Sequence, residues 1–242
     1  MPRQRRVYEP GLSLHVIQRG NNGADIFAAA ADYLRLLALI GAASRRERVD
    51  VHAFVLMTTH FHLLVTPQDE NTLARFTQRV DGQFAQYYNR QYGRIGTFWN
   101  GRYRGITIRD ERQWLTCLRY IEQNPVRAHM VETPDRYRWS SYKAHAWGES
   151  WPAWLKPHRC YLQLGPDPVA RQAAYRAICG IPLGDNELRI QRNPPRRIVV
   201  EGRSTGAPGL TQGSDPSAPN QAIRPRSGRQ RRTMTQSDQR QV

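Results

Sequence analysis

The sequence predicts an α+β fold whose elements follow the order strand, helix, strand, strand, helix, strand, helix. Four segments are predicted as strands: residues 12–18, which alternate in polarity, residues 49–57 and 60–66, which place apolar residues at alternate positions, and residues 102–108. Apolar residues recur at helical spacing along three others: residues 28–46, 71–92 and 111–124. A split β-α-β-β-α-β order favours a ferredoxin-like sandwich, in which helices cover one face of a largely antiparallel sheet.

The second and third predicted strands are expected to form a hairpin. One face of the first of them collects Val49, Val51, Ala53, Val55 and Met57. Thr58-Thr59 is short enough to be the turn. The core face of the returning strand collects Phe61, Leu63 and Val65. Because side chains alternate across a strand, His60 and His62 point together to the opposite face.

The predicted helices are defined by their apolar stripes and by their ends. The first carries Leu36, Leu37 and Ile40. The stripe of the second collects Leu73, Phe76, Val80, Phe84 and Tyr87 or Tyr88. Asp110 and Gln113 resemble a capping box that opens the third helix, and Pro125 stops that helix near Asn124.

Composition divides the chain into three regions. Residues 1–145 hold the α+β domain. Residues 146–185 form a short helical extension, in which Asp167-Pro168 opens a helix that ends before Gly180. Residues 186–242 hold 11 arginines and 4 acidic residues among many Gly, Pro, Ser and Gln. Such a segment cannot bury enough apolar surface to order itself, so we expect a disordered basic tail.

The charge of the chain indicates an anionic partner. Its 242 residues carry a formal net charge of +16, and all but two of the 36 basic residues are arginines. The planar fork of arginine suits bidentate contact with phosphate, so nucleic acid is the expected partner. A coding bias towards arginine explains the ratio of Arg to Lys equally well, but the charge itself remains.

Other features of the sequence argue for a cytoplasmic protein. The longest apolar stretch, residues 27–43, is broken by Asp32 and Arg35, and it is too short and too charged to cross a bilayer. No apolar segment follows the basic start, as a secretory signal would require. The three cysteines are widely spaced, which suits neither a disulfide framework nor a zinc cluster.

Four residues form a candidate set for metal-assisted chemistry. His60 and His62 share one face of a strand, and Tyr120 and Asn124 are one helical turn apart. Neutral imidazoles are common metal ligands, and a phenol at the border of an apolar helix face is accessible to act as a nucleophile. Each feature alone has a simpler explanation. Most isolated His-x-His pairs are surface histidines, most lone tyrosines at a core rim are structural, and Asn before Pro commonly ends a helix.

Three motifs of the chain resemble a known family. The first is Met57-Thr58-Thr59-His60-Phe61-His62-Leu63-Leu64-Val65, the second is Gly96-Thr97-Phe98-Trp99-Asn100-Gly101-Arg102-Tyr103, and the third is Tyr120-Ile121-Glu122-Gln123-Asn124-Pro125-Val126-Arg127. Together they resemble the single-tyrosine HUH transposases and, within that superfamily with its IS200-like transposase domain, the REP-associated tyrosine transposases. Residues 18–22 and 139–142 add further matches, and the resemblance covers about residues 7–145.

The resemblance implies a role for each candidate residue. His60 and His62 would bind a divalent metal ion, Mg²⁺ or Mn²⁺, and Asn124 would complete the metal site. Tyr120 would attack DNA and form a 5′-phosphotyrosine intermediate. One departure is Thr58, where many relatives have proline, and this affects the stiffness of the turn rather than the chemistry. Whether His15 belongs to a second set of ligands stays open.

The resemblance also implies a substrate. It is single-stranded DNA that carries hairpins, the folded form of repetitive extragenic palindromes, and the protein would act as a monomer or homodimer in a bacterial cytoplasm, bound to the nucleoid when it is on DNA. Candidate DNA-binding residues are Arg19, Arg94, Trp99, Arg102, Tyr103, Arg104 and Arg127. Charge interleaved with aromatic rings suits single strands, because arginines contact the backbone while rings stack on bases. The alternative for the aromatic residues is packing in the core.

Two rival functions remain open at this stage. A protein derived from a transposase could bind DNA hairpins without cutting them, although such a binder has no need of all four candidate residues together. A metal-dependent phosphodiesterase that uses water would form no covalent adduct and would not depend on Tyr120.

Overall fold

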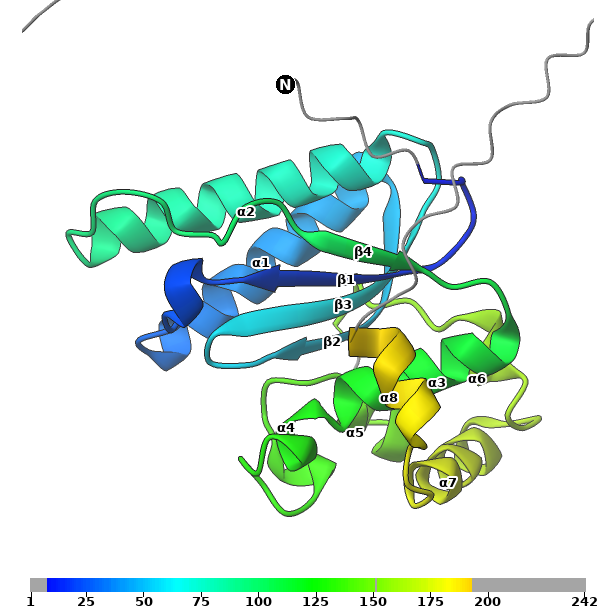
Figure 1. The fold of residues 1–242 in the computed structure, drawn as a ribbon. Helices are drawn as coiled ribbons and strands as arrows, with labels where there is room; N and C mark the ends of the chain where they lie inside the picture. The colour runs from blue at the N-terminus through cyan, green and yellow to red at the C-terminus, as the bar shows by residue number, and fades with distance from the viewer. Residues whose placement is uncertain (1–7, 151, 193–242) are drawn as a thin grey trace, which may run out of the picture. The chain divides into compact units, whose positions relative to one another are not determined.

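The computed structural model describes residues 8–150 and 152–192, which form a four-stranded antiparallel sheet with helices on both faces (Figure 1). The predicted elements are present as β1 (Leu14–Arg19), α1 (Ala30–Glu47), β2 (Val49–Leu56), β3 (His60–Pro67), α2 (Thr72–Gln91), β4 (Arg104–Thr107) and α3 (Glu111–Glu122). The sheet order is β2-β3-β1-β4, and all neighbouring strands are antiparallel. This order confirms the split β-α-β-β-α-β, ferredoxin-like topology.

Helices cover both faces of the sheet, whereas the sequence predicted helices on one face. The first face packs against α1 and α2 through a cluster that includes Leu14, Val16, Leu36, Ile40, Phe61, Leu63, Phe76 and Phe84. The second packs against α3 through a cluster that includes Ala53, Val55, Leu64, Trp114, Cys117, Leu118 and Ile121. Figure 1 shows α1 and α2 on one side of the strands and α3 with the later helices on the other. The prediction was wrong because the strands are apolar on both faces, and the apolar arc of α3 packs on the second one.

Strand β2 changes face in its middle. The register with β3 shifts between Val51 and Ala53, so His52 forms a bulge. Val51 therefore packs with α1 and α2, whereas Ala53 and Val55 pack with α3. The expectation that Val49, Val51, Ala53, Val55 and Met57 share one face was wrong, because an alternating pattern does not reveal a bulge in a strand that is buried on both sides. The hairpin itself is confirmed, and the Met57 amide donates to the His60 carbonyl across it.

The third helix ends earlier than its sequence pattern predicted. Its N-terminus is capped as expected, since the Asp110 carboxylate accepts from the Gln113 amide at 2.7 Å and the Gln113 side chain accepts from the Arg109 amide. The helix ends at Glu122, and Gln123 adopts φ −89° and ψ 3°. Asn124 then opens a separate short helix, α4 (Asn124–Arg127), with Pro125 in its first turn. Tyr120 and Asn124 therefore do not lie on one continuous helix.

Further helices follow the α+β core and pack against α3. They are α5 (Tyr142–Trp147), α6 (Arg159–Leu162), α7 (Pro168–Cys179) and α8 (Asp185–Arg192), and two short 3₁₀ turns lie at Asn21–Gly23 and Pro134–Arg136. Helix α7 starts as predicted, since the Asp167 side chain caps the Ala170 amide. None of the helices within residues 8–150 and 152–192 is long and apolar enough to span a membrane.

Helix α8 occupies residues that were expected to be tail. The predicted tail began at residue 186, but Leu188 packs against the cluster beneath α3 and the Thr116 hydroxyl bonds to Glu187 at 3.3 Å. These tertiary contacts order a segment whose composition is polar. Residues 193–242, the rest of the expected tail, lie outside the described residues.

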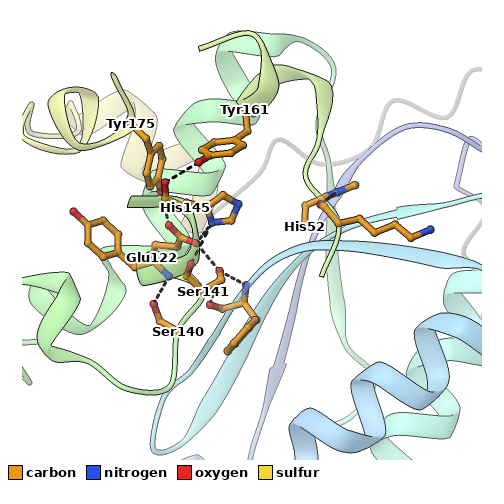
Figure 2. Close-up of polar contacts among 10 residues, drawn as sticks. His52, Glu122, Ser140, Ser141, His145, Tyr161 and Tyr175 are labelled. Carbon is orange, nitrogen blue, oxygen red and sulfur yellow. Dashed lines mark hydrogen bonds and ion pairs between the residues drawn. The ribbon is translucent and has the colours of Figure 1, made fainter. Parts of the chain in front are cut away.

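A buried carboxylate joins α3 to the later helices (Figure 2). Glu122 is fully buried at the last position of α3. Its Oε1 accepts from the Ser141 hydroxyl and lies 2.8 Å from His145 Nδ1, and its Oε2 accepts from the Tyr175 hydroxyl. Ser141 also bonds to the Phe54 backbone of β2. One side chain thus connects β2, α3, α5 and α7.

We expect Glu122→Ala to lower the free energy of unfolding by about 3 kcal/mol, because Tyr175, Ser141 and His145 would each lose a buried hydrogen-bond partner. Denaturant unfolding measures this loss. Glu132→Ala, which removes an exposed carboxylate, is the matched control and should have little effect. Equal stability of the two variants would show that the network contributes nothing.

Candidate functional site

The register of the sheet gathers the two histidines of β3 with basic residues of β1 and β4. His60 lies opposite Arg19, and His62 lies opposite Ile17, which in turn lies opposite Arg104. Directly opposed residues of neighbouring strands point to the same face of a sheet. The two imidazoles and the two guanidinium groups therefore share the face that α3 covers. The prediction that His60 and His62 point away from the face of Phe61 is confirmed.

His62 is the centre of a buried cluster of polar side chains. Its Nε2 lies 2.9 Å from Asn124 Nδ2, and its Nδ1 lies 2.7 Å from His15 Nε2. The other ring nitrogen of His15 lies 2.9 Å from the Gln191 side-chain oxygen. His60 is the neighbouring ring, with its centroid 4.9 Å from that of His62. The structure thus brings both predicted histidines and the predicted asparagine together.

Helix α3 places Tyr120 against the same cluster. The centroid of its ring lies 6.0 Å from that of His62 and 5.6 Å from that of His15. The Arg127 guanidinium lies over the Tyr120 ring, with Cζ 4.1 Å from the centroid, and it also donates to the Tyr120 carbonyl. Tyr120 is 7% exposed, so it is more buried than its position at the border of the apolar arc of the helix suggested. Helix α3 ends before Asn124, but the chain after Gln123 still places the Asn124 side chain beside His62.

The site favours neutral imidazoles. Burial lowers the pKa of His60 to about 4, and the Arg19 guanidinium contributes. Burial also lowers the pKa of His62 well below its ordinary value, and the nearby His15, His60 and Arg127 act in the same direction. At neutral pH both rings therefore carry a lone pair that is available to a ligand.

The donor set suits a divalent metal ion with open coordination positions. Among the described residues no three His, Cys, Asp or Glu side chains gather as ligands. The pair His60 and His62 therefore needs the side-chain oxygen of Asn124 as a third donor. The Asn124 side-chain nitrogen lies 2.9 Å from His62 Nε2, and rotation of the amide group by half a turn exchanges this nitrogen for the oxygen. Two imidazoles and one amide leave positions for water and phosphate oxygens, which Mg²⁺ and Mn²⁺ accept.

Three of the predicted DNA-binding arginines lie near the histidine pair, whereas Arg94 does not. Arg19 and Arg102 are exposed, and Arg104 and Arg127 are half-buried, with Arg19, Arg104 and Arg127 around the histidine pair. Burial and the charge of Arg19 lower the pKa of Arg104, so the positive groups of this face lie near one another. Arg94 lies elsewhere, with its guanidinium 3.1 Å from the Thr97 carbonyl and over the ring of Phe98.

The expectation that Trp99 and Tyr103 stack on bases is not supported. Their side chains are 8% and 6% exposed, and both belong to the core cluster beneath α1 and α2. The indole of Trp99 donates to the Asp81 carbonyl at 2.8 Å and packs edge-on against Phe61. These rings fill the core on the sheet face opposite to His62, which was the alternative that the sequence left open.

His15 and Gln191 are site residues whose positions the sequence did not predict. The sequence left open whether His15 belongs to a second set of ligands; in the structure its side chain lies within hydrogen-bonding distance of the His62 side chain. A histidine within the alternating strand of residues 12–18 was the available signal. Gln191 gave no signal, because it lies in a polar segment that α3 orders only through tertiary contacts.

Comparisons with known proteins bear on the family and the fold of the chain. Residues 9–124 match the family model described as transposase IS200-like. The solved structure of a REP-associated tyrosine transposase bound to a REP hairpin matches with a TM-score of 0.52 and 20% identity, over 66% of this chain and 96% of that chain. A protein from Deinococcus radiodurans assigned as a transposase matches with a TM-score of 0.34 and 20% identity, over 47% and 91%. No curated protein matches the chain.

We expect the His60 ring to stay neutral until the pH approaches its pKa of about 4. The unfolded chain protonates a histidine near pH 6.5, so protonation favours the unfolded state, and stability falls as the pH drops from about 6.5 towards 4. An NMR titration of the metal-free protein measures this pKa. Arg19→Gln should raise it, whereas Arg90→Gln on exposed α2 surface should not. A wild-type pKa at the ordinary value would contradict the burial of this ring.

Proposed function

We propose that this protein, whose residues 9–124 belong to the IS200-like transposase family, cuts and rejoins single-stranded DNA through a covalent bond to Tyr120. The family supports a DNA-processing enzyme, and the site supports the finer mechanism. The substrate that we propose is DNA with hairpins of the REP type, because the structure of similar fold holds such a hairpin.

One observation carries the proposal. His62 lies far from Tyr120 and Asn124 in the sequence, yet β3, α3 and α4 bring the imidazole, the phenol ring and the amide together. A nucleophile beside a set of metal donors is the arrangement that transfer of a phosphodiester to tyrosine requires. A protein that only binds DNA has no use for buried, neutral histidines next to a phenol.

The proposed reaction is a transesterification at phosphorus. The Tyr120 oxygen forms a bond to the phosphorus of the scissile phosphodiester, and the bond from phosphorus to the 3′-oxygen breaks. The phenol loses one proton and the departing 3′-oxygen gains one, so the step consumes no net proton. The product is a 5′-phosphotyrosine with a free 3′-hydroxyl. Attack by another 3′-hydroxyl reverses the step and joins strands, because the covalent bond keeps the energy of the cleaved linkage.

Each group around Tyr120 has a role in this step. Arg19, Arg104 and Arg127 supply positive charge that attracts the phosphate to the face of the histidines. Arg127 also holds the Tyr120 ring through its contact over the ring face. His60, His62 and Asn124 would hold Mg²⁺ or Mn²⁺, which when bound stabilises negative charge on the phosphate oxygens.

We expect Tyr120→Phe to abolish a protein–DNA adduct that survives denaturation, because the variant lacks the attacking oxygen. The assay incubates the protein with single-stranded hairpin oligonucleotides and Mn²⁺ or Mg²⁺, followed by a denaturing gel. Tyr88→Phe removes a phenol from α2 on the opposite face of the sheet and serves as the control. Cleavage that continues in Tyr120→Phe without an adduct would favour a phosphodiesterase that uses water. Hairpin binding with no adduct in wild type, in either metal, would favour a binding protein.

We expect His60→Ala to lose metal-dependent cleavage by at least about 100-fold while hairpin affinity changes little, because the arginines that attract phosphate remain. Adduct formation and a gel-shift assay measure the two effects separately. His129→Asn is the control, because His129 is exposed and its positive φ of 55° is tolerated by asparagine. Undiminished cleavage in His60→Ala would remove this residue from the metal site.

A further inference from the structure

Three consecutive hydrogen bonds, two buried and one partly buried, run from Asn124 to the last described helix. Asn124 Nδ2 lies 2.9 Å from His62 Nε2, His62 Nδ1 lies 2.7 Å from His15 Nε2, and His15 Nδ1 lies 2.9 Å from Gln191 Oε1. His62 is 2% exposed, Gln191 is 1% exposed and His15 is fully buried. Water therefore has little access to the two hydrogen bonds that His15 makes.

Both ends of this series of hydrogen bonds require the same tautomer of His62 and of His15. A neutral imidazole donates from one nitrogen and accepts at the other. At one end, His62 can ligate a metal through Nε2 only if that nitrogen is unprotonated, so Nδ1 carries the hydrogen and donates to His15 Nε2. His15 must then carry its own hydrogen on Nδ1. At the other end, that nitrogen faces the side-chain oxygen of Gln191, which can only accept.

We propose that His15 is a positioning residue for the metal site, which holds His62 in the tautomer whose lone pair points from Nε2 towards Asn124, and that Gln191 of α8 orients His15. This inference rests on the proposed function in taking His62 as a metal ligand. Histidine ligands of metals commonly donate their second nitrogen to an oriented acceptor, and the loss of such a partner costs about 10- to 100-fold in metal affinity. Here the acceptor is a second imidazole rather than a carboxylate or a carbonyl.

The sheet makes this arrangement rigid. His15 lies in β1, two residues before Ile17, which is the cross-strand partner of His62. The two histidines are therefore diagonal neighbours on one face, and their rings stack with centroids 5.0 Å apart and an interplanar angle of 26°.

The arrangement also assigns a role to α8. Gln191 reaches His15 from the second-last residue of α8, and the same helix is held on α3 by Leu188 and by the bond between Thr116 and Glu187. Figure 1 shows α8 lying beside α3 beneath the sheet. The extension therefore contributes to the metal site although it supplies no ligand.

Titration of the metal-free protein with Mn²⁺, without DNA, tests the proposal. We expect His15→Phe to weaken Mn²⁺ binding about 10- to 100-fold. His15→Gln should restore much of the affinity, because the side-chain oxygen of glutamine can accept from His62 Nδ1. His52→Phe is the matched control, since His52 is also a buried histidine of the sheet but bonds to Thr66 and Lys156. Unchanged Mn²⁺ affinity in His15→Phe would overturn the proposal.

The same titration tests α8. Gln191→Ala should weaken Mn²⁺ binding, by less than His15→Phe, because it loosens the ring of His15 without removing it. Arg189→Ala, an exposed change on the same helix, is the control and should have no effect. An equal effect of the two α8 variants would show that Gln191 does not orient His15.

A second measurement needs neither metal nor DNA. Nitrogen-15 NMR of the metal-free protein distinguishes the two neutral tautomers of a histidine ring. We expect His62 and His15 to carry their hydrogens on Nδ1, and we expect His62 to lose this preference in His15→Phe. A wild-type His62 protonated at Nε2 would overturn the proposal.

The outcomes separate this inference from the proposed function. Adduct formation that requires Tyr120, together with Mn²⁺ affinity that ignores His15, would overturn the inference alone. The expected tautomers and Mn²⁺ losses without any adduct would support the inference and overturn the proposed reaction. Absence of Mn²⁺ binding in wild type would overturn the metal site and, with it, the role of His15 there.

Discussion

The geometry of the site depends on the hydrogen bonds of one buried carboxylate, that of Glu122. A carboxylate without water must be hydrogen-bonded, and donors from Ser141, His145 and Tyr175 meet this need from two other helices. Glu122 lies two residues after Tyr120 and two before Asn124. By holding the end of α3 against β2, α5 and α7, this carboxylate fixes the segment that carries both the phenol and the amide. The hydrogen bonds of Glu122 thus help to determine where Tyr120 and Asn124 lie.

The layer that Glu122 anchors also creates the electrostatic character of the site. Because α3 covers the second face of the sheet, His62 is buried and His60 is half-buried, and this burial lowers their pKa values. Neutral imidazoles can accept a metal ion, but a dry site would repel a phosphate anion. The guanidinium groups of Arg19 and Arg104 offset this cost from the neighbouring strands. Burial and positive charge act together, so the site suits the metal ion and the phosphate of the proposed function.

The elements that depend on local pattern were predictable from the sequence, and those that depend on tertiary contacts were not. Alternation fixed the hairpin and the common face of His60 and His62, and the capping box located the start of α3. The bulge at His52 leaves no trace in an apolar strand that is buried on both sides. Trp99 lies in a basic, irregular segment, so nothing local distinguishes a core indole from an exposed one. Gln191 is polar in a polar segment, and only its contact with His15 gives it a role.

The groups of the proposed reaction come from two layers, and this sets the precision that the fold must reach. The imidazoles belong to the sheet, whereas Tyr120 and Asn124 belong to the helical layer on its second face. A shift between the layers would change the distance from Tyr120 to the proposed metal donors, and catalytic sites tolerate errors of only about 0.5 Å. Two separate ties oppose such a shift: Ser141 bonds the Glu122 network to β2, and Gln191 bonds α8 to His15 of β1. The later helices therefore help to hold the histidines of the sheet and the Tyr120 and Asn124 side chains in a fixed relative position.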